Sequence, residues 1–197
     1  MKLELRKRMR ALRGALPATA CAERSARICA SILSLEPVAA AAAAALFWPI
    51  EERREVDLRT LDACLRDRGV RVAYPSVAQE DFPMTFQFVE DTGTMEERTS
   101  FGIKLRQPAA DEPPVARGEL DVIVVPALAV DPNGQRIGYG AGCYDRTLPQ
   151  FAPPAVSIAV AFDFQLIAEV PVTPGDVPVD FVVTDARTLR CKADSVP

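Results

Sequence analysis

The chain of 197 residues contains no histidine, and none of its five cysteines belongs to a C-x-x-C pair. Without histidine, neither a Ser-His-Asp triad nor a Cys-His pair can be built, and we expect no zinc site. The cysteines are scattered, at Cys21, Cys29, Cys64, Cys143 and Cys191. An odd number of scattered thiols is typical of a reducing compartment, so we expect a cytoplasmic protein.

Long apolar segments and an excess of positive charge are also missing. The longest apolar run, residues 38–50, is mostly alanine and contains Pro49, so it is too short to span a bilayer. The first residues, from Lys2 to Arg13, are charged, and we expect no signal peptide. The net charge of −4 comes without a basic stripe, which argues against general nucleic-acid binding. We therefore expect no membrane partner, no nucleic-acid partner and a monomer.

Helical patterns and apolar runs alternate along the chain. We expect helices at residues 2–16, 19–35 and 58–68, and strands at residues 43–48, 70–74, 85–89, 122–125, 156–162 and 181–185. This order predicts an α/β fold, a single domain (1–190) with a mostly parallel central sheet flanked by helices. Residues 191–197 are expected to form a loose tail, and the polar, proline-rich residues 91–118 a long loop. The phenylalanines Phe82, Phe86 and Phe88 are expected in the core.

The most informative stretch runs from the apolar strand 122–125 through three alternate glycines, Gly138, Gly140 and Gly142, to a helix start at Cys143. Strand, glycine loop and helix N-terminus together form a geometry that binds phosphate, because backbone N–H groups and the helix dipole both attract an anion. The spacing is neither the Rossmann nor the P-loop fingerprint, so an ordinary glycine-rich connection remains an alternative.

Two charged residues follow this loop in the first helical turn. Arg146 offers a fixed cation with a bidentate fork. Asp145 is a hard oxygen ligand, placed where Mg²⁺ that bridges phosphates could sit.

These residues resemble the motifs of a known family. The pair Val125-Pro126, the turn 129–131 and the run I-G-Y-G-A-G-C-Y-D-R at 137–146 are similar to those of the 5-formyltetrahydrofolate cyclo-ligases, also called 5,10-methenyltetrahydrofolate synthetases. Weaker matches lie at 2–6 and 55–57. The resemblance implies an α/β fold and an ATP- and Mg²⁺-dependent cyclisation of 5-formyltetrahydrofolate to 5,10-methenyltetrahydrofolate, with release of ADP and phosphate.

The resemblance also implies roles for individual residues. It assigns catalysis to Arg146 and Asp145, and the metal to Asp145 and Asp176. It assigns the reduced folate to Trp48, Glu55 and Tyr144. The residues that it assigns to ATP are Lys2, Arg6, Gly138, Tyr139, Gly140, Ala141, Gly142, Cys143, Tyr144, Asp145 and Arg146.

Each assignment has a plainer alternative. The basic face of the first helix, with Lys2 and Arg6, is otherwise a solvated surface. Trp48 is otherwise a core residue, and Glu55 belongs to a solvated loop. Cys143 replaces a tyrosine of the family motif, and we interpret it as a space-filling substitution rather than a reactive thiol.

Departures from the family pattern leave two other functions open. An E-P pair expected after Phe101-Gly102-Ile103 is missing, and Gly175 replaces a histidine before Asp176. Tyr139 and Ala141 stand where the family often has arginine and lysine. The chain could therefore be a paralogue that binds nucleotide without cyclo-ligase activity, or a non-enzymatic binding module on the same scaffold.

Overall fold

The computed structural model describes residues 1–77, 83–109 and 113–191. The α-helices are α1 Lys2–Gly14, α2 Ala18–Leu33, α3 Glu36–Ala39, α4 Arg59–Asp67 and α5 Cys143–Phe151. Short 3₁₀ helices are η1 Glu51–Arg53, η2 Thr92–Thr94 and η3 Asp163–Gln165. The strands are β1 Ala43–Ala45, β2 Arg71–Ser76, β3 Thr85–Phe88, β4 Glu96–Ser100, β5 Ile103–Gln107, β6 Val122–Pro126, β7 Ala129–Val130, β8 Arg136–Ile137, β9 Val156–Val160, β10 Phe181–Val183 and β11 Thr188–Arg190.

The central sheet of the described residues has seven strands in the order β11-β10-β9-β6-β1-β2-β3. The neighbours from β10 to β2 pair in parallel, and only the edge strands β11 and β3 are antiparallel. The predicted α/β fold with a mostly parallel sheet is therefore confirmed. From the middle of the sheet, β1 continues to β2 on one side and β6 continues to β9 on the other. The strand order thus reverses between β1 and β6, and ligands of open α/β sheets bind beyond the strand ends at such a point.

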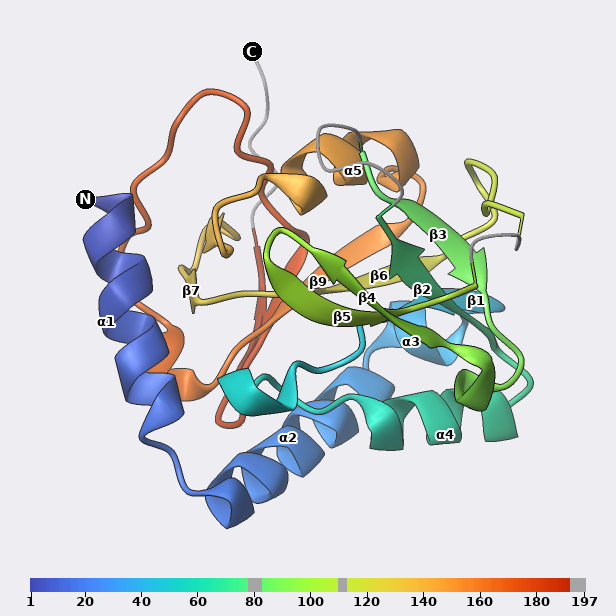
Figure 1. Cartoon of the computed structure of the whole chain (residues 1–197), viewed down its shortest axis with the longest axis horizontal. Coiled ribbons are helices and arrows are strands. Elements are labelled where there is room, and N and C mark those ends of the chain that lie inside the picture. Colours follow the sequence, from blue (N-terminus) through green and yellow to red (C-terminus); the bar gives the residue numbers. More distant parts are fainter. Residues whose placement is uncertain (78–82, 110–112, 192–197) are drawn as a thin grey trace.

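Helices cover both faces of this sheet (Figure 1). The side chains of Val122 and Val124 pack in one cluster with residues of α2 and α4. Ile123 and Val125, which point the other way along the same strand, pack in a second cluster with residues of α5. All four side chains are buried. Burial of an aliphatic side chain contributes roughly 1.5–3 kcal/mol, so the unbroken apolar run is accounted for by contacts on both faces.

Strand β1 consists of three alanines, a residue that favours helices when it stands alone. Tertiary contacts override this preference, because β1 is paired on both sides, with β2 and with β6. The carboxylate of Asp121 accepts hydrogen bonds from the backbone N–H groups of Ala42 (2.8 Å) and Ala43 (2.9 Å). Asp121 therefore holds the start of β1 against the start of β6.

The prediction of a long loop over residues 91–118 was wrong. Strands β4 and β5 form an antiparallel hairpin in which Ser100 pairs with Ile103. Its two-residue turn, Phe101-Gly102, has φ angles of +53° and +67°, as hairpin turns with matching twist require. The prediction followed charge and proline content, whereas the alternation of Ile103, Leu105 and Gln107 with exposed residues is the strand signal.

Cys191, the first residue of the predicted loose tail, has a buried side chain, and its N–H donates to the carbonyl of Asp180. The remainder of the predicted tail, 192–197, and Phe82 lie outside the described residues. Phe86 is buried in the core, and Phe88 packs against the same cluster. None of the helices in the described segments has both the length and the apolar composition that a membrane span needs.

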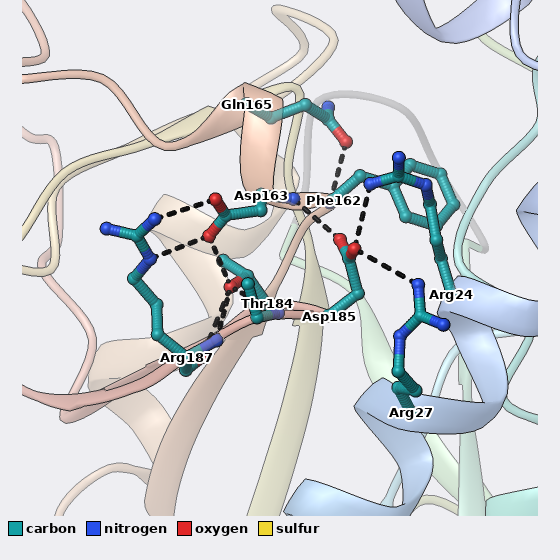
Figure 2. A network of polar contacts seen from close by, with 9 residues as sticks. Arg24, Arg27, Phe162, Asp163, Gln165, Thr184, Asp185 and Arg187 are labelled. Atoms are coloured by element: carbon teal, nitrogen blue, oxygen red, sulfur yellow. Dashed lines mark hydrogen bonds and ion pairs between the residues drawn. The ribbon is translucent and has the colours of Figure 1, made fainter.

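A polar network joins α2 to the carboxyl ends of β9 and β10 (Figure 2). The side chain of Asp185 is only 5% exposed. One of its oxygens accepts a hydrogen bond from Arg24 (2.8 Å), and the other accepts one from the backbone N–H of Asp163 (2.7 Å). Arg187 pairs with Asp163 in turn. These hydrogen bonds and ion pairs compensate for the burial of the polar side chain of Asp185.

We predict that Asp185→Ala lowers the free energy of unfolding by about 1–3 kcal/mol, because it leaves the Asp163 N–H without its partner and removes the anchor of α2. Urea unfolding followed by circular dichroism measures this change. Asp67→Ala, at an exposed site on α4, is the control and should change stability by less than about 0.5 kcal/mol. Equal effects of the two substitutions would contradict a structural role of the network.

Candidate active site

One pocket of about 350 Å³ opens at the point where the strand order reverses. Phe47 and Trp48, which follow β1, and Pro126, the last residue of β6, belong to its wall. The glycine loop between β8 and α5 forms another side, and the N-terminal residues of α1 form a third. The site therefore lies beyond the carboxyl ends of β1 and β6, where an α/β sheet is expected to bind its ligand.

The glycine loop needs its glycines for conformation and for space. Gly140 and Gly142 have φ angles of +114° and +67°, which side chains other than glycine rarely adopt. A Cβ atom at Gly142 would lie 3.1 Å from Nη1 of Arg146, and one at Gly140 would lie 3.4 Å from Cζ of Arg6. Helix α5 begins directly after Gly142, so its positive N-terminal end faces the same loop.

Helix α1 brings cations to this loop. Nε of Arg6 donates a hydrogen bond to the carbonyl of Gly138 at 3.0 Å. Lys2 forms an ion pair with Asp176 and also donates to the hydroxyl of Thr173 at 2.8 Å. Both cations line the pocket, as i and i+4 positions of one helix face can.

Two aspartates lie at the same end of the pocket. Asp145 accepts hydrogen bonds from Arg136 (2.9 Å) and from the N–H of Val177 (3.2 Å), both at Oδ1. Asp176 accepts its bonds from Lys2 and Thr173 at Oδ2. Desolvation acts to raise the pKa of Asp176, but the hydrogen bonds from Lys2 and Thr173 outweigh it and hold the pKa below its usual value. Each carboxylate thus keeps one oxygen that accepts no hydrogen bond from a described residue.

These two free oxygens suit Mg²⁺ that arrives with a nucleotide. In the described residues there is no cluster of three or more Asp, Glu, Cys or His side chains that could hold a metal alone. A nucleotide-bound Mg²⁺ does not need one, because phosphates and water supply most of its oxygens and the protein adds one or two carboxylates. Asp145 and Asp176 fit that requirement.

Glu55 is a buried residue of the pocket wall. Its Oε2 accepts a hydrogen bond from the N–H of Ile50 (2.8 Å), and its Oε1 accepts one from the hydroxyl of Tyr139 (2.7 Å). Arg13, which is also buried, donates to the same hydroxyl. Burial raises the pKa of Glu55, although Arg13 and these hydrogen bonds oppose the rise. The glutamate is therefore held in one orientation by the loop residue Tyr139.

The far end of the pocket is apolar and aromatic. Trp48 is partly exposed there, with the ring of Tyr74 at 6.0 Å and the guanidinium of Arg106 at 4.8 Å from its own ring centroid. The hairpin β4–β5 supplies further wall residues, namely Phe101, Ile103, Leu105, Arg106 and Gln107. A flat, partly polar ring system fits between such groups.

The structure brings all but one of the site residues predicted from the sequence into this pocket. Arg146 is the exception, because its side chain is exposed and Nη1 donates to the carbonyl of Ala141 at 2.8 Å. Arg146 therefore contacts the glycine loop from outside the pocket. Cys143 is the first residue of α5 and lines the pocket, and Tyr144 lies beside it.

The wall residues that the sequence analysis missed include those of the hairpin and Arg136. The hairpin residues could have been found from their alternation, as described above. Arg136 was missed because nothing in the local sequence separates it from a surface arginine, although its side chain is only 3% exposed.

Comparison with known proteins agrees with this geometry. Residues 1–185 match the sequence model of the 5-formyltetrahydrofolate cyclo-ligase family. The 5-formyltetrahydrofolate cyclo-ligase of Mycolicibacterium smegmatis is 41% identical over 128 residues, which cover 64% of this chain and 65% of that protein. The enzyme of the same name from Escherichia coli K12 is 37% identical over 87 residues, or 43% of this chain and 48% of that protein.

Solved structures of methenyltetrahydrofolate synthetases have the same fold as this chain. The NMR structure of Aquifex aeolicus 5,10-methenyltetrahydrofolate synthetase superposes with a TM-score of 0.83 at 27% identity, over 100% of this chain and 95% of that one. The Mycoplasma pneumoniae synthetase shares the fold, with a TM-score of 0.74 at 24% identity, over 93% of this chain and 98% of that one.

The alignments with the two curated relatives are shorter than the structural ones, and span 65% and 48% of those proteins' lengths. The family match is longer and extends over most of the sequence, from residue 1 to residue 185 of 197. The chain therefore belongs to the 5-formyltetrahydrofolate cyclo-ligase family.

Proposed function

We propose that the protein catalyses the ATP- and Mg²⁺-dependent cyclisation of 5-formyltetrahydrofolate to 5,10-methenyltetrahydrofolate, with release of ADP and phosphate. The observation that carries the proposal is the composition of the pocket. One end combines a glycine loop, a helix N-terminus and two cations, and the other end combines aromatic rings with a buried glutamate. We infer from this composition that the triphosphate of a nucleotide and the pterin of a reduced folate meet in this cavity.

At the nucleotide end, the backbone N–H groups of the loop and the side chains of Lys2 and Arg6 would receive the phosphate oxygens. Lys2 is paired with Asp176, and a phosphate would compete for its charge. Phosphoryl transfer depends on positioning and on neutralisation of charge, so a site without histidine is adequate. Mg²⁺ bound at Asp145 and Asp176 would supply further neutralisation of the phosphate charge.

At the folate end, Glu55 would receive the pterin. The edge of a reduced pterin presents an amide N–H and an amine, which a carboxylate accepts as a pair of parallel hydrogen bonds. Each oxygen of Glu55 already accepts one hydrogen bond and has a second lone pair available. Trp48 would provide an aromatic surface for the pterin ring.

The proposed reaction has two steps. The formyl oxygen of the folate attacks the γ-phosphorus of ATP, and ADP leaves. N10 of the folate then attacks the activated formyl carbon, and the ring closes. N10 releases its proton to water, and inorganic phosphate leaves with the former formyl oxygen. Both nucleophiles, the formyl oxygen and N10, belong to the folate, so neither step requires one from the protein. It has to hold the formyl oxygen and the γ-phosphate in contact and to exclude water from them.

The direct test is formation of the methenyl product by the purified protein, followed by absorbance, with ATP, Mg²⁺ and 5-formyltetrahydrofolate present. We expect turnover that stops when either ATP or the metal is omitted. A protein that binds MgATP in a thermal-shift assay but forms no product would be a nucleotide-binding paralogue. A protein that binds neither ligand would be a scaffold without this activity, and the proposal would fail.

We predict that Glu55→Gln weakens folate binding by about 10–100-fold, because it removes a charge-assisted pair of hydrogen bonds worth about 1.5–3 kcal/mol. Isothermal titration calorimetry with 5-formyltetrahydrofolate measures this loss. Glu52→Gln, in the exposed part of η1, is the matched control and should bind folate as the wild type does. Unchanged affinity in Glu55→Gln would remove the glutamate from the site.

We also predict that Glu55→Gln changes how the free energy of unfolding depends on pH. Because burial raises the pKa of Glu55 in the folded state, its ionisation favours unfolding. The stability of the wild type relative to Glu55→Gln should therefore fall as the pH rises from about 4.5, the ordinary value, through the raised pKa. Urea unfolding of both proteins at pH 5.5 and pH 8 tests this. A difference that is constant, or that grows with pH, would contradict burial of an ionisable Glu55.

We also predict that Lys2→Ala and Arg6→Ala each raise the KM for ATP by roughly 10-fold or more, since one charged contact to phosphate is worth about 1.5–3 kcal/mol. Steady-state kinetics with varied ATP measures the effect. Arg8→Ala is the control, because Arg8 lies exposed on the same helix and outside the pocket wall. An equal rise in KM for Arg8→Ala would indicate a general effect of charge rather than contact.

A further inference from the structure

Arg136 is a buried arginine in the wall of the nucleotide end. It lies on β8, just before the glycine loop, and its side chain is 3% exposed. Its Nη2 donates to Oδ1 of Asp145 at 2.9 Å, and its guanidinium lies 5.8 Å from the ring centroid of Tyr144. Its Nε is buried and has no hydrogen-bond partner in the described part of the chain. A charged group with an unpaired donor is costly to bury, so the bonding of its partner Asp145 bears on what the pair does.

The hydrogen bonds that Asp145 accepts differ from those of the aspartates in the other Arg–Asp pairs of the described residues. In those pairs both carboxylate oxygens accept hydrogen bonds or ion pairs from protein groups. The aspartates concerned are Asp57, Asp62, Asp163 and Asp185. At Asp145, by contrast, Arg136 and the N–H of Val177 both donate to Oδ1, and Oδ2 accepts nothing from a described residue.

The pair of Arg66 and Asp62 is the closest structural counterpart. Arg66 also has a buried nitrogen without a partner, and it also pairs with a largely buried aspartate. There, Arg66 and the hydroxyl of Tyr74 occupy both oxygens of Asp62, and neither Asp62 nor Arg66 lines the pocket. A pair that only joins two elements therefore saturates its carboxylate. The Arg136 pair leaves one oxygen unused, on a residue that lines the pocket.

We propose that Arg136 is a positioning residue, which fixes Asp145 by one oxygen and keeps the other oxygen available to a cation that enters with the nucleotide. This inference rests on the proposed function. Arg136 is bonded to Asp145 through Nη2, and we assign its role to this contact rather than to direct binding of a ligand. Outer groups of this kind orient a metal ligand, and their loss typically weakens metal binding by 10–100-fold.

The test uses Mn²⁺ as the probe, with a non-hydrolysable ATP analogue at saturation and electron paramagnetic resonance to count free metal. In Arg136→Met we expect the dissociation constant of Mn²⁺ to rise about 10–100-fold. Affinity for the analogue without metal should stay within about 3-fold, because the proposed role of Arg136 is exerted on the metal ligand Asp145. A comparable loss without metal would instead indicate direct contact of Arg136 with the nucleotide and would overturn the inference. Arg136→Lys, which restores a charge but not the planar fork, should recover part of the metal affinity.

Arg66→Met is the matched control, because it removes an equivalent pair outside the pocket. It should lower the midpoint of thermal unfolding without changing the dissociation constant of Mn²⁺. If Arg136→Met fails to fold, Arg136→Lys is tested in its place. Its dissociation constant for Mn²⁺ should rise by a smaller factor, and that of Arg66→Lys should not rise. Wild-type affinity for Mn²⁺ in a folded Arg136 variant would overturn the inference. Absence of metal-dependent nucleotide binding in the wild type would instead contradict the proposed function.

Discussion

Helix α1 is held against the glycine loop by charged groups, and the pocket depends on this contact. Arg6 donates to the carbonyl of Gly138, and Lys2 pairs with Asp176 from the other side of the pocket. Apolar contact is smaller here, since Met9 packs with Ile137 and Leu128 in a minor cluster. Lys2 and Arg6 thus hold α1 at the pocket and are also the cations that a phosphate would contact. The same two charges would therefore serve both the packing of α1 and the binding of a nucleotide.

The loop residue Tyr139 connects the two ends of the site. Its backbone belongs to the glycine loop, while its hydroxyl holds Glu55 and accepts a hydrogen bond from Arg13. The ring lies among three guanidinium groups, with that of Arg53 at 4.6 Å from its centroid. Where the family often carries a loop arginine, this chain places a tyrosine that binds arginines from α1 and η1. Positive charge is therefore kept near the loop by other elements.

The sequence predicted the sheet and the glycine loop because their signals are local. The run 122–125 is apolar on both faces, and the alternate glycines occupy backbone conformations that other residues rarely adopt. The hairpin β4–β5 was predicted as a loop, since its charged strands resemble a solvated segment. Arg136 was not foreseen, because its burial and its ion pair with Asp145 are properties of the folded chain. The exposed position of Arg146 is likewise a property of the folded helix.

The central claim is that nucleotide and folate share one pocket, with the triphosphate at the glycine loop and α1. A crystal structure with Mg²⁺, a non-hydrolysable ATP analogue and 5-formyltetrahydrofolate tests it most directly. The account predicts phosphate oxygens within hydrogen-bond distance of the backbone N–H groups at 138–142 and of Lys2 and Arg6, with the pterin edge on Glu55. A triphosphate bound elsewhere, or a pocket closed to it by the side chain of Tyr139 or Arg6, would contradict the account.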